Sequence, residues 1–385
     1  MSVVFIGAGG FLGSRVLRRL LAEGTRERVT VLGRGSPGKL RERVTAAVAW
    51  LDGPPLDPGA PDRVRYLGAD LTLPGLGLDP GSRARLAAGT EVVWHCAGPT
   101  RLIGDDPAPL YAGNVRGTRA VLDLAEEAAD AHFVHVSTAF VAGRRRTGHI
   151  KEDDLSDAHG FATYYEESKY TAEKLVRAWA ERHGRAVTVA RPSLLLADRP
   201  APAGIPAQPL DVVSRLIDEY FFPAREPGNS SRLRGGTASF RLPGDPRGTL
   251  NLLQADYAAD ALTRVVAAHR ARTFTGVRTV HLTHPCETGF TVAKEAFETL
   301  YPGLTLTLTP KVPNPSRPEA VLAEHAASLL DFSDHRRTYD RSHLLADLGG
   351  LPDPPPVDSD CLRRALDRSG GRGTSMSAPA GGAEP

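Results

Sequence analysis

The stretch Val3-Val-Phe-Ile-Gly-Ala-Gly-Gly-Phe-Leu-Gly13 decides the fold of this chain. Its apolar start predicts a buried strand, and an amphipathic helical pattern begins directly after the glycines. Between the two, we expect Gly7 to form a tight turn, Gly10 to let the backbone approach a pyrophosphate, and Gly13 to allow the helix to pack closely on the strand. The helix N-terminus would then face the phosphates of a dinucleotide. A purely structural turn is the alternative interpretation.

Short apolar runs alternate with helical patterns along the first half of the chain. The runs predicted as buried strands are Val3–Ile6, Val29–Leu32, Val64–Leu67, Val92–His95, Phe133–Val136 and Val187–Ala190. This alternation predicts an α/β fold, a Rossmann-like doubly wound parallel sheet with helices on both faces. Ligands of such sheets bind at the carboxyl ends of the strands, so we expect the segments that follow the strands to converge on one crevice.

The pattern changes after Val187–Ala190, which suggests two domains. We assign residues 1–196 to a dinucleotide-binding Rossmann domain that is completed by about 247–285, where Val277–Leu282 is a further predicted strand. Residues 197–246 and 286–368 would form a smaller, mostly C-terminal substrate-binding domain.

Within the smaller domain we expect a helix over 210–221 and a strand at Leu304–Leu308. A loop between these two elements would carry Arg225, Arg232, Arg234 and Arg241. The tail 369–385 is rich in Gly, Ser, Ala and Pro, and is predicted to be disordered.

Composition narrows the function classes. The chain has 385 residues, of which 41% are apolar and 24% charged, as in ordinary globular proteins. With a net charge of +2 we expect neither nucleic acid nor a membrane as the main partner. No signal peptide or spanning segment is expected. The three cysteines are far apart, which suits a reducing cytoplasm. No metal-ligand pattern occurs among the histidines, so we predict no metal. The sequence is also compatible with a homodimer.

The end of the second predicted strand indicates which dinucleotide binds. An acidic residue there would hold the ribose 2′-hydroxyl of NAD, but this sequence has none. Arg34, supported by Ser36, Lys39 or Arg43, suits the 2′-phosphate of NADPH instead. The alternative is a solvated basic turn.

Asp70 and Asn114 have two interpretations each, and Cys96 has one. Asp70, together with Leu71, either borders the adenine or caps a turn. Asn114 either holds a water or the backbone near the site, or caps a helix. Cys96 ends an apolar run and is expected to be a small buried residue.

Tyr165 and Lys169 carry the strongest chemical signal. A spacing of four residues places both side chains on one face of a helix predicted to end near Gly184. A nearby cation lowers the pKa of a phenol, which would make Tyr165 a proton donor or acceptor near neutral pH. Ser137-Thr138 follow the fifth predicted strand, and the Thr138 hydroxyl could orient a carbonyl against Tyr165. Together with the glycine turn, these residues predict hydride transfer to or from a carbonyl.

With these residues in place, the chain resembles the extended short-chain dehydrogenase/reductases. Within them it is similar to the thioester-reductase and fatty-acyl-reductase branch, with the male sterility type of NAD-binding domain. The matching stretches are 7–13, Ala-Asp-Leu-Thr (69–72), His-Cys-Ala-Gly (95–98), Asn-Val-Arg-Gly-Thr (114–118), 134–143, Tyr-Glu-Glu-Ser-Lys (165–169), Arg-Pro-Ser (191–193), 242–246 and 251–257. The resemblance covers about residues 2–285. Ala97-Gly98 departs from the family's usual Ala-Ala.

The resemblance implies roles for individual residues. The catalytic set would be Thr138, Tyr165 and Lys169, with Ser137 beside them, and Pro192-Ser193 would lie by the nicotinamide. The expected cofactor-binding residues are Gly7, Gly9, Gly10, Phe11, Leu12, Gly13, Arg34, Ser36, Lys39, Arg43, Asp70, Leu71, Ala97, Gly98, Asn114, Tyr165, Lys169, Pro192 and Ser193. Because no carrier-protein or adenylation domain is expected in the chain, a thioester substrate would come from a separate carrier protein or from coenzyme A.

The leading hypothesis is therefore an NADPH-dependent reductase of an acyl thioester that yields an aldehyde or alcohol. The alternative is a ketone or aldehyde reductase, or a hydroxyl dehydrogenase, acting on a sugar, terpenoid or polyketide. A sugar dehydratase fits less well, because such enzymes carry Asp-Glu after the catalytic Thr, where this chain has Ala139-Phe140. A non-catalytic NADP-sensing protein fits less well too, since such proteins usually lose the Tyr or the Lys. Arg144–Arg146 are expected to flank the substrate entrance or to be ordinary surface.

Overall fold

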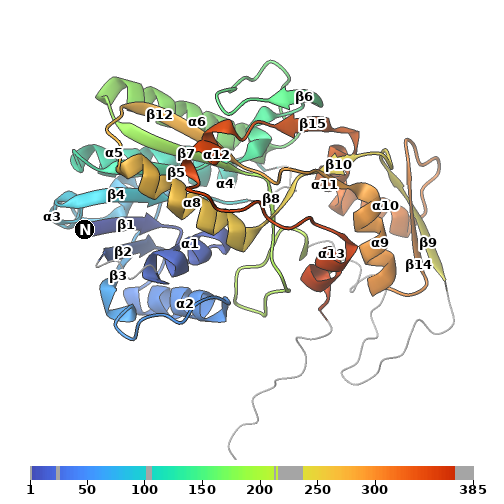
Figure 1. The fold of residues 1–385 in the computed structure, drawn as a ribbon, viewed down its shortest axis with the longest axis horizontal. Coiled ribbons are helices and arrows are strands. Elements are labelled where there is room, and N and C mark those ends of the chain that lie inside the picture. Colours follow the sequence, from blue (N-terminus) through green and yellow to red (C-terminus); the bar gives the residue numbers. More distant parts are fainter. Residues whose placement is uncertain (1, 23–26, 101–105, 212–213, 216–236, 369–385) are drawn as a thin grey trace, which may run out of the picture.

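The computed structural model describes residues 2–22, 27–100, 106–211, 214–215 and 237–368. Its centre is a seven-stranded sheet in the order β12-β7-β5-β4-β1-β2-β3, in which every neighbouring pair is parallel (Figure 1). The strands are β1 (Ser2–Ile6), β2 (Arg28–Gly33), β3 (Val64–Gly68), β4 (Thr90–His95), β5 (His132–Val136), β7 (Ala186–Pro192) and β12 (Gly276–Leu282). The predicted α/β fold class and each strand predicted for this sheet are confirmed.

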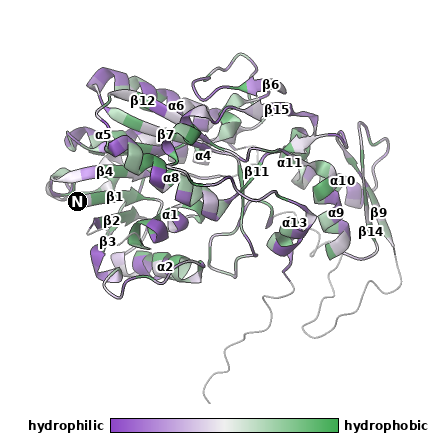
Figure 2. Ribbon diagram, in the orientation of Figure 1, coloured by the Kyte–Doolittle hydropathy of each residue, from purple (hydrophilic) through white to green (hydrophobic). Residues whose placement is uncertain are grey.

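Helices cover both faces of the sheet. They are α1 (Phe11–Ala22), α2 (Pro37–Trp50), α3 (Pro80–Ala87), α5 (Gly117–Glu127), α6 (Tyr164–His183), α8 (Ala255–Arg270) and α12 (Ser342–Asp347). Alternate residues of β1 explain the two layers: Val3 and Phe5 pack with α1, α2 and α8, whereas Val4 and Ile6 pack with α5. Figure 2 shows the apolar strands of the sheet between helices that mix apolar and polar residues.

The strand order reverses beside β1, and this position matters for function. Strands β2 and β3 lie on one side of β1, while β4, β5, β7 and β12 follow on the other. In an open parallel sheet, a ligand crevice forms at the carboxyl ends of the strands at such a switch point. The glycine turn that follows β1 lies at this end of the sheet.

A second hydrophobic cluster lies at the far end of the molecule from β3 (Figure 1). It contains β9 (Ala238–Pro243) paired with β14 (Leu304–Thr309), and the helices α9 (Phe290–Leu300), α10 (Arg317–His325), α11 (Ala327–Leu330) and α13 (Ser359–Leu366). Leu304–Leu308 is thus confirmed as part of a strand. The division into two domains stays a prediction, because this cluster also includes Phe140 and Tyr165 of the region assigned to the Rossmann domain.

Short strand pairs join the two regions. They are β6 (Thr147–Ile150) with β15 (Arg336–Tyr339), β8 (Leu194–Leu196) with β11 (Leu252–Gln254), and β10 (Thr249–Leu250) with β13 (Thr288–Gly289). A short helix, α4 (Ala108–Leu110), precedes a π-helical turn at Tyr111–Arg116.

Some sequence-based expectations need correction. Arg241 lies in β9 rather than in a loop, because β9 pairs with β14 and Arg241 is opposite Thr307; its guanidinium also pairs with Glu319 of α10 at 2.8 Å. Cys96 as a whole residue keeps some exposed surface, although its thiol is buried. Arg225, Arg232, Arg234, most of the helix predicted over 210–221 and the tail 369–385 lie outside the described residues.

Candidate active site at the carboxyl end of the sheet

The glycine turn has the tight geometry expected from the sequence. Gly7 has a φ of +93°, which favours glycine, and its carbonyl accepts a hydrogen bond from the Gly10 N–H at 2.9 Å. A Cβ on Gly7 would lie 2.6 Å from the backbone of Ala97, and a Cβ on Gly13 would lie 2.1 Å from the Gly7 carbonyl oxygen. The turn therefore packs against the end of β4, and α1 packs against the turn. Dinucleotide binding by this turn stays a prediction for the individual residues.

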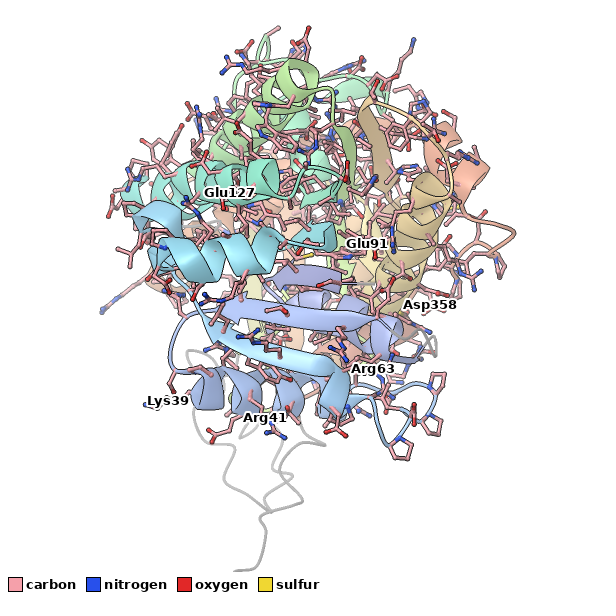
Figure 3. All side chains as sticks on the ribbon, turned by 90° about the vertical axis from the view of Figure 1, so that its left-hand side faces the viewer. Lys39, Arg41, Arg63, Glu91, Glu127 and Asp358 are labelled. Carbon is pink, nitrogen blue, oxygen red and sulfur yellow. The ribbon has the colours of Figure 1, made fainter. Side chains whose placement is uncertain are left out.

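Basic residues gather beside the turn, at the end of β2. Arg34, Lys39 and Arg43 are exposed, and Figure 3 shows Lys39 at the outer edge of α2. The Arg43 guanidinium donates to the Arg34 carbonyl at 3.4 Å, and its Nε would lie 3.4 Å from a Cβ on Gly9. Ser36 caps α2 by accepting from the Lys39 N–H. The structure therefore brings the predicted 2′-phosphate residues together next to the glycine turn.

Asp70 closes a turn, as one of its two interpretations predicts. Its carboxylate accepts from the Thr72 N–H at 2.8 Å and from the Thr72 hydroxyl at 2.7 Å. These hydrogen bonds, with a smaller contribution from Arg34, lower the pKa of Asp70. Leu71 is partly buried against the cluster under α5 and lies next to Gly117. A role for Asp70 or Leu71 at the adenine stays a prediction.

Asn114 is not a helix cap, and that interpretation was wrong. It lies inside the π-helical turn, where its amide donates to the Pro99 carbonyl at 3.2 Å and to the Ser168 hydroxyl at 3.0 Å. Ser168 in turn donates to the Tyr165 carbonyl at 2.9 Å. The wider turn thus links Asn114 to the first turn of α6. A Cβ at Gly98 would lie 2.2 Å from the Asn114 Oδ1, which explains why this chain has Gly there.

Thr138 and Tyr165 come together where β5 ends. Thr138 caps a 3-10 turn by accepting from the Phe140 N–H at 3.2 Å, and it donates to the Pro192 carbonyl at 3.4 Å. The Tyr165 phenol lies close enough to the Thr138 hydroxyl for this hydroxyl to influence the pKa of the phenol. Thr138, Tyr165 and Pro192, which the sequence placed on three separate elements, therefore meet at one point. Ser193, which follows β7, is buried and donates its N–H to the Leu282 carbonyl at 3.0 Å.

The protonation states differ from the sequence-based expectation. Burial raises the pKa of Tyr165 to about 12, although the Thr138 hydroxyl opposes the rise. Burial outweighs the effect expected from Lys169, whose ammonium group donates to the Val136 carbonyl at 2.6 Å. Burial lowers the pKa of Lys169 to about 8, against the opposing charge of Glu173. The expected lowering of the Tyr165 pKa was wrong, since the sequence does not reveal how deeply the phenol is buried.

Ser137 has a different set of neighbours from Thr138. Its hydroxyl donates at 2.8 Å to Glu173, which is fully buried in α6. Glu173 also accepts two hydrogen bonds from the buried Arg191, at 3.0 and 2.7 Å. Sequence reasoning missed Glu173 and Ser168. For Glu173 the available signal was Arg191, the one charged residue of a strand that is otherwise uncharged and mostly apolar.

The residues expected at the substrate entrance are partly ion-paired. Arg145 pairs with Asp154 at 3.0 Å, and Arg146 lies 3.8 Å from Asp331 and 3.5 Å from Asp334. Arg144 is exposed. Their steering role stays a prediction.

One cavity in the described part of the chain lies away from these residues. It has a volume of about 420 Å³ and is bounded by Arg177, Glu181 and Gly276, among others. Gly276 is the first residue of β12, so this cavity lies at the end of the sheet opposite Thr138. Its position gives it no part in the chemistry proposed for Tyr165.

The sequence profile of the family described as "Male sterility protein" matches residues 6–261. The chain belongs to this family. It is thus an extended short-chain dehydrogenase/reductase with an NAD(P)-binding Rossmann fold. No group of three or more potential metal-ligating side chains occurs in the part of the chain that the structure describes. Among the same residues, no helix has the length and apolarity needed to cross a membrane.

Relatives of this male sterility family member include multidomain synthases. The "Isonitrile lipopeptide synthase" of Streptomyces coeruleorubidus is 33% identical over 49% of this chain, and the "Iterative polyketide synthase afoE" of Emericella nidulans is 28% identical over 47%. The matches span 13% and 7% of those two proteins. The crystal structure of the terminal R domain from the myxalamid PKS-NRPS biosynthetic pathway matches with a TM-score of 0.74 and 23% identity, over 97% of this chain and 91% of that one. This similarity shows the shared fold.

Proposed function

We propose that this protein is an NADPH-dependent reductase that transfers hydride to the carbonyl of an acyl thioester. The acyl group would be bound to a carrier protein or to coenzyme A, and the product would be an aldehyde or an alcohol. The proximity of the Thr138 and Tyr165 hydroxyls at the carboxyl end of β5 carries this proposal. Its support from relatives is the sequence similarity to synthases and the fold shared with a terminal R domain.

The residues at the glycine turn fit a dinucleotide. A Cβ on Gly7 or on Gly13 would collide with neighbouring backbone, so the close packing of β1, the turn and α1 requires glycine at both positions, as in dinucleotide-binding turns. The start of α1 directly after this turn offers N–H groups to an anion. When bound, NADPH supplies the hydride. The 2′-phosphate would be held by Arg34 and Arg43, with Lys39 nearby.

The chain's own residues would then act on the substrate oxygen. Thr138 and Tyr165 orient the carbonyl by hydrogen bonds, and Tyr165 donates the proton as the oxygen gains negative charge. A Tyr165 pKa of about 12 keeps this phenol protonated at neutral pH, as a donor must be. Loss of the thiol from the reduced thioester leaves the aldehyde, and a second hydride would give the alcohol.

A dehydratase is disfavoured by the residues that follow Thr138. Ala139 and Phe140 form the 3-10 turn there, and Phe140 is buried against Phe332 with ring centroids 4.7 Å apart. This position therefore offers no carboxylic acid for the elimination of water. The alternative that remains is reduction of a free ketone or aldehyde.

Substrate assays test the proposed function. Purified protein is mixed with NADPH and with octanoyl-CoA, octanal or 2-octanone, and the loss of absorbance at the nicotinamide band is followed. Oxidation of NADPH with octanoyl-CoA, together with release of free thiol, supports thioester reduction. Turnover of the ketone alone favours the alternative, and no oxidation with any carbonyl contradicts a reductase.

Replacing Arg34 with alanine should weaken NADPH binding much more than NADH binding. A hydrogen bond to a charged group contributes roughly 1.5–3 kcal/mol, which corresponds to about 10- to 150-fold in Kd. Fluorescence titration of both cofactors measures the effect. Arg41→Ala is a matched control, because Arg41 is an exposed arginine on the neighbouring helix α2 and lies outside the predicted set (Figure 3). Equal losses for the two cofactors would reject a 2′-phosphate role.

Charge reversal of Arg144–Arg146 should raise KM for acyl-CoA, most strongly at low salt, and leave a small aldehyde unaffected. The reason is that exposed charges steer phosphates over a Debye length of about 8 Å at physiological ionic strength. Because Arg145 and Arg146 are ion-paired, Arg144→Glu alone is the cleaner variant. If octanoyl-CoA and octanal respond alike, Arg144 is ordinary surface.

A further inference from the structure

We propose that Glu173 is a positioning residue, which keeps Lys169 in its charged form and joins the three elements that carry the catalytic groups. This inference rests on the proposed function for its consequence in catalysis, but the effect on Lys169 is a property of the chain by itself. Glu173 lies one helical turn after Lys169 on α6, so the two side chains share one face of the helix.

The hydrogen bonds of Glu173 connect separate parts of the site. Its Oε2 accepts from the Ser137 hydroxyl at 2.8 Å and from the Arg191 Nε at 3.0 Å, and its Oε1 accepts from the Arg191 Nη2 at 2.7 Å. Ser137 precedes Thr138 directly after β5, and Arg191 precedes Pro192 in β7. One carboxylate in α6 thus holds the two strand ends that carry Thr138 and its hydrogen-bond acceptor Pro192.

A third donor completes the environment of the carboxylate. Arg177, one turn further along α6, donates to Oε1 at 2.8 Å and to the Thr279 hydroxyl of β12 at 2.7 Å. Although burial alone would raise it, Arg191 and then Arg177 and Ser137 hold the pKa of Glu173 at about 2. Glu173 is therefore ionised throughout the working range of pH.

The other titratable side chains that face Lys169 from β4 and β5 are uncharged near neutral pH. From β4, burial lowers the pKa of His95 to about 3 and raises the pKa of Cys96 to about 12. From β5, burial holds the pKa of His135 well below its usual value. In the described part of the chain, Glu173 is thus the neighbour whose negative charge opposes the loss of the Lys169 proton. Without that charge, burial should favour the neutral amine.

Removing the negative charge of Glu173 and removing the positive charge of Arg177 should shift the titration of Lys169 in opposite directions. Glu173→Gln removes the anion and should lower the midpoint at which Lys169 titrates by about one pH unit or more, as is usual for a close opposite charge. Arg177→Gln removes a competing cation and should raise that midpoint. Because Arg177 is about a quarter exposed, its variant should fold even where Glu173→Gln does not. A role in folding alone would loosen the site and shift the midpoint in the same direction in both variants.

The experiment is a pH titration by NMR of protein labelled with 13Cε-lysine. The Lys169 signal is assigned by its loss in Lys169→Arg. Glu181→Gln is the control, because Glu181 is an exposed carboxylate on the same helix. In this variant the Lys169 midpoint should match that of the wild type. Shifts of opposite sign in Glu173→Gln and Arg177→Gln support the proposal. An unchanged midpoint in Glu173→Gln, or in Arg177→Gln if the other variant is unfolded, overturns it.

Kinetics then separate this inference from the proposed function. The alkaline limb of kcat for NADPH oxidation with octanal should move to lower pH in Glu173→Gln, together with the NMR midpoint. If the midpoint moves while no carbonyl is reduced by the wild type, the proposed function fails and the Glu173 inference stands. If octanal is reduced normally but the midpoint does not move, the Glu173 inference fails alone.

Discussion

Replacing Tyr165 with phenylalanine is expected to lower kcat by about 10²- to 10⁴-fold, the usual contribution of a general acid. The variant loses only the hydroxyl that lies close to Thr138. The ring remains, and it packs in the same apolar cluster as Leu110, Phe140 and Leu194. Thr138 keeps its hydrogen bond to the Pro192 carbonyl. We therefore expect an unchanged fold and unchanged affinity for NADPH.

The measurement is the steady-state rate of NADPH oxidation with octanoyl-CoA and octanal, alongside a cofactor titration. Tyr164→Phe provides a matched control. It also removes a tyrosine hydroxyl, from the residue next to Tyr165, and the Tyr164 side chain is 43% exposed. That control should keep the wild-type kcat. A Tyr165→Phe enzyme with near-normal turnover would remove Tyr165 from the catalytic assignment.

The second large effect is on stability. Arg191→Met should lower the free energy of unfolding by ~3–5 kcal/mol, because breaking a buried ion pair leaves the other charge without its partner. The Arg191 and Glu173 side chains are 1% and 0% exposed. Arg191 also donates to the backbone carbonyl of Glu152 at 3.2 Å, so its removal leaves that carbonyl with one donor fewer.

Urea unfolding followed by circular dichroism measures this loss. The double variant Glu173→Gln/Arg191→Met should recover much of the stability, since replacement of a buried pair by neutral groups is often close to neutral. Arg264→Met is the control: Arg264 is 45% exposed and pairs with Asp260 on the surface of α8, so it should cost at most ~1 kcal/mol. Equal small losses for Arg191→Met and Arg264→Met would show that the buried pair adds no stability.

The sheet could be predicted from the sequence because its strands are buried on both faces. Runs such as Phe133–Val136 and Val187–Ala190 are apolar apart from one polar residue each, His135 and Thr188, and this pattern is local. The short pairs β10 with β13 and β15 with β6 were not predicted. Each is defined by a partner far along the chain, as when Arg336 pairs with Thr147. Arg241 was misplaced for the same reason, since its strand partner Thr307 is distant in sequence.

The sequence predicted which residues form the site better than it predicted their pKa values. The spacing of Tyr165 and Lys169 correctly placed both on one face of α6, but it could not show that the Lys169 ammonium contacts Val136 instead of lowering the Tyr165 pKa. The π-helical turn around Asn114 has no recognisable local pattern, so a helix cap was a natural but wrong expectation. Glu173 carries no motif of its own, and only its contacts with Ser137 and Arg191 reveal it.

The last strand of the sheet, β12, has a practical consequence for anyone who shortens this protein. The family match ends at residue 261, inside α8, whereas β12 spans Gly276–Leu282. A fragment cut at the family boundary would keep β7 but lose its hydrogen-bonded neighbour along the whole strand. The backbone N–H and C=O groups of β7 that pair with β12 would then lack hydrogen-bond partners, beside apolar side chains such as Val187 and Val189. Bare edges of this kind recruit other chains into intermolecular sheets, so aggregation of such a fragment would reflect the cut and not the native protein.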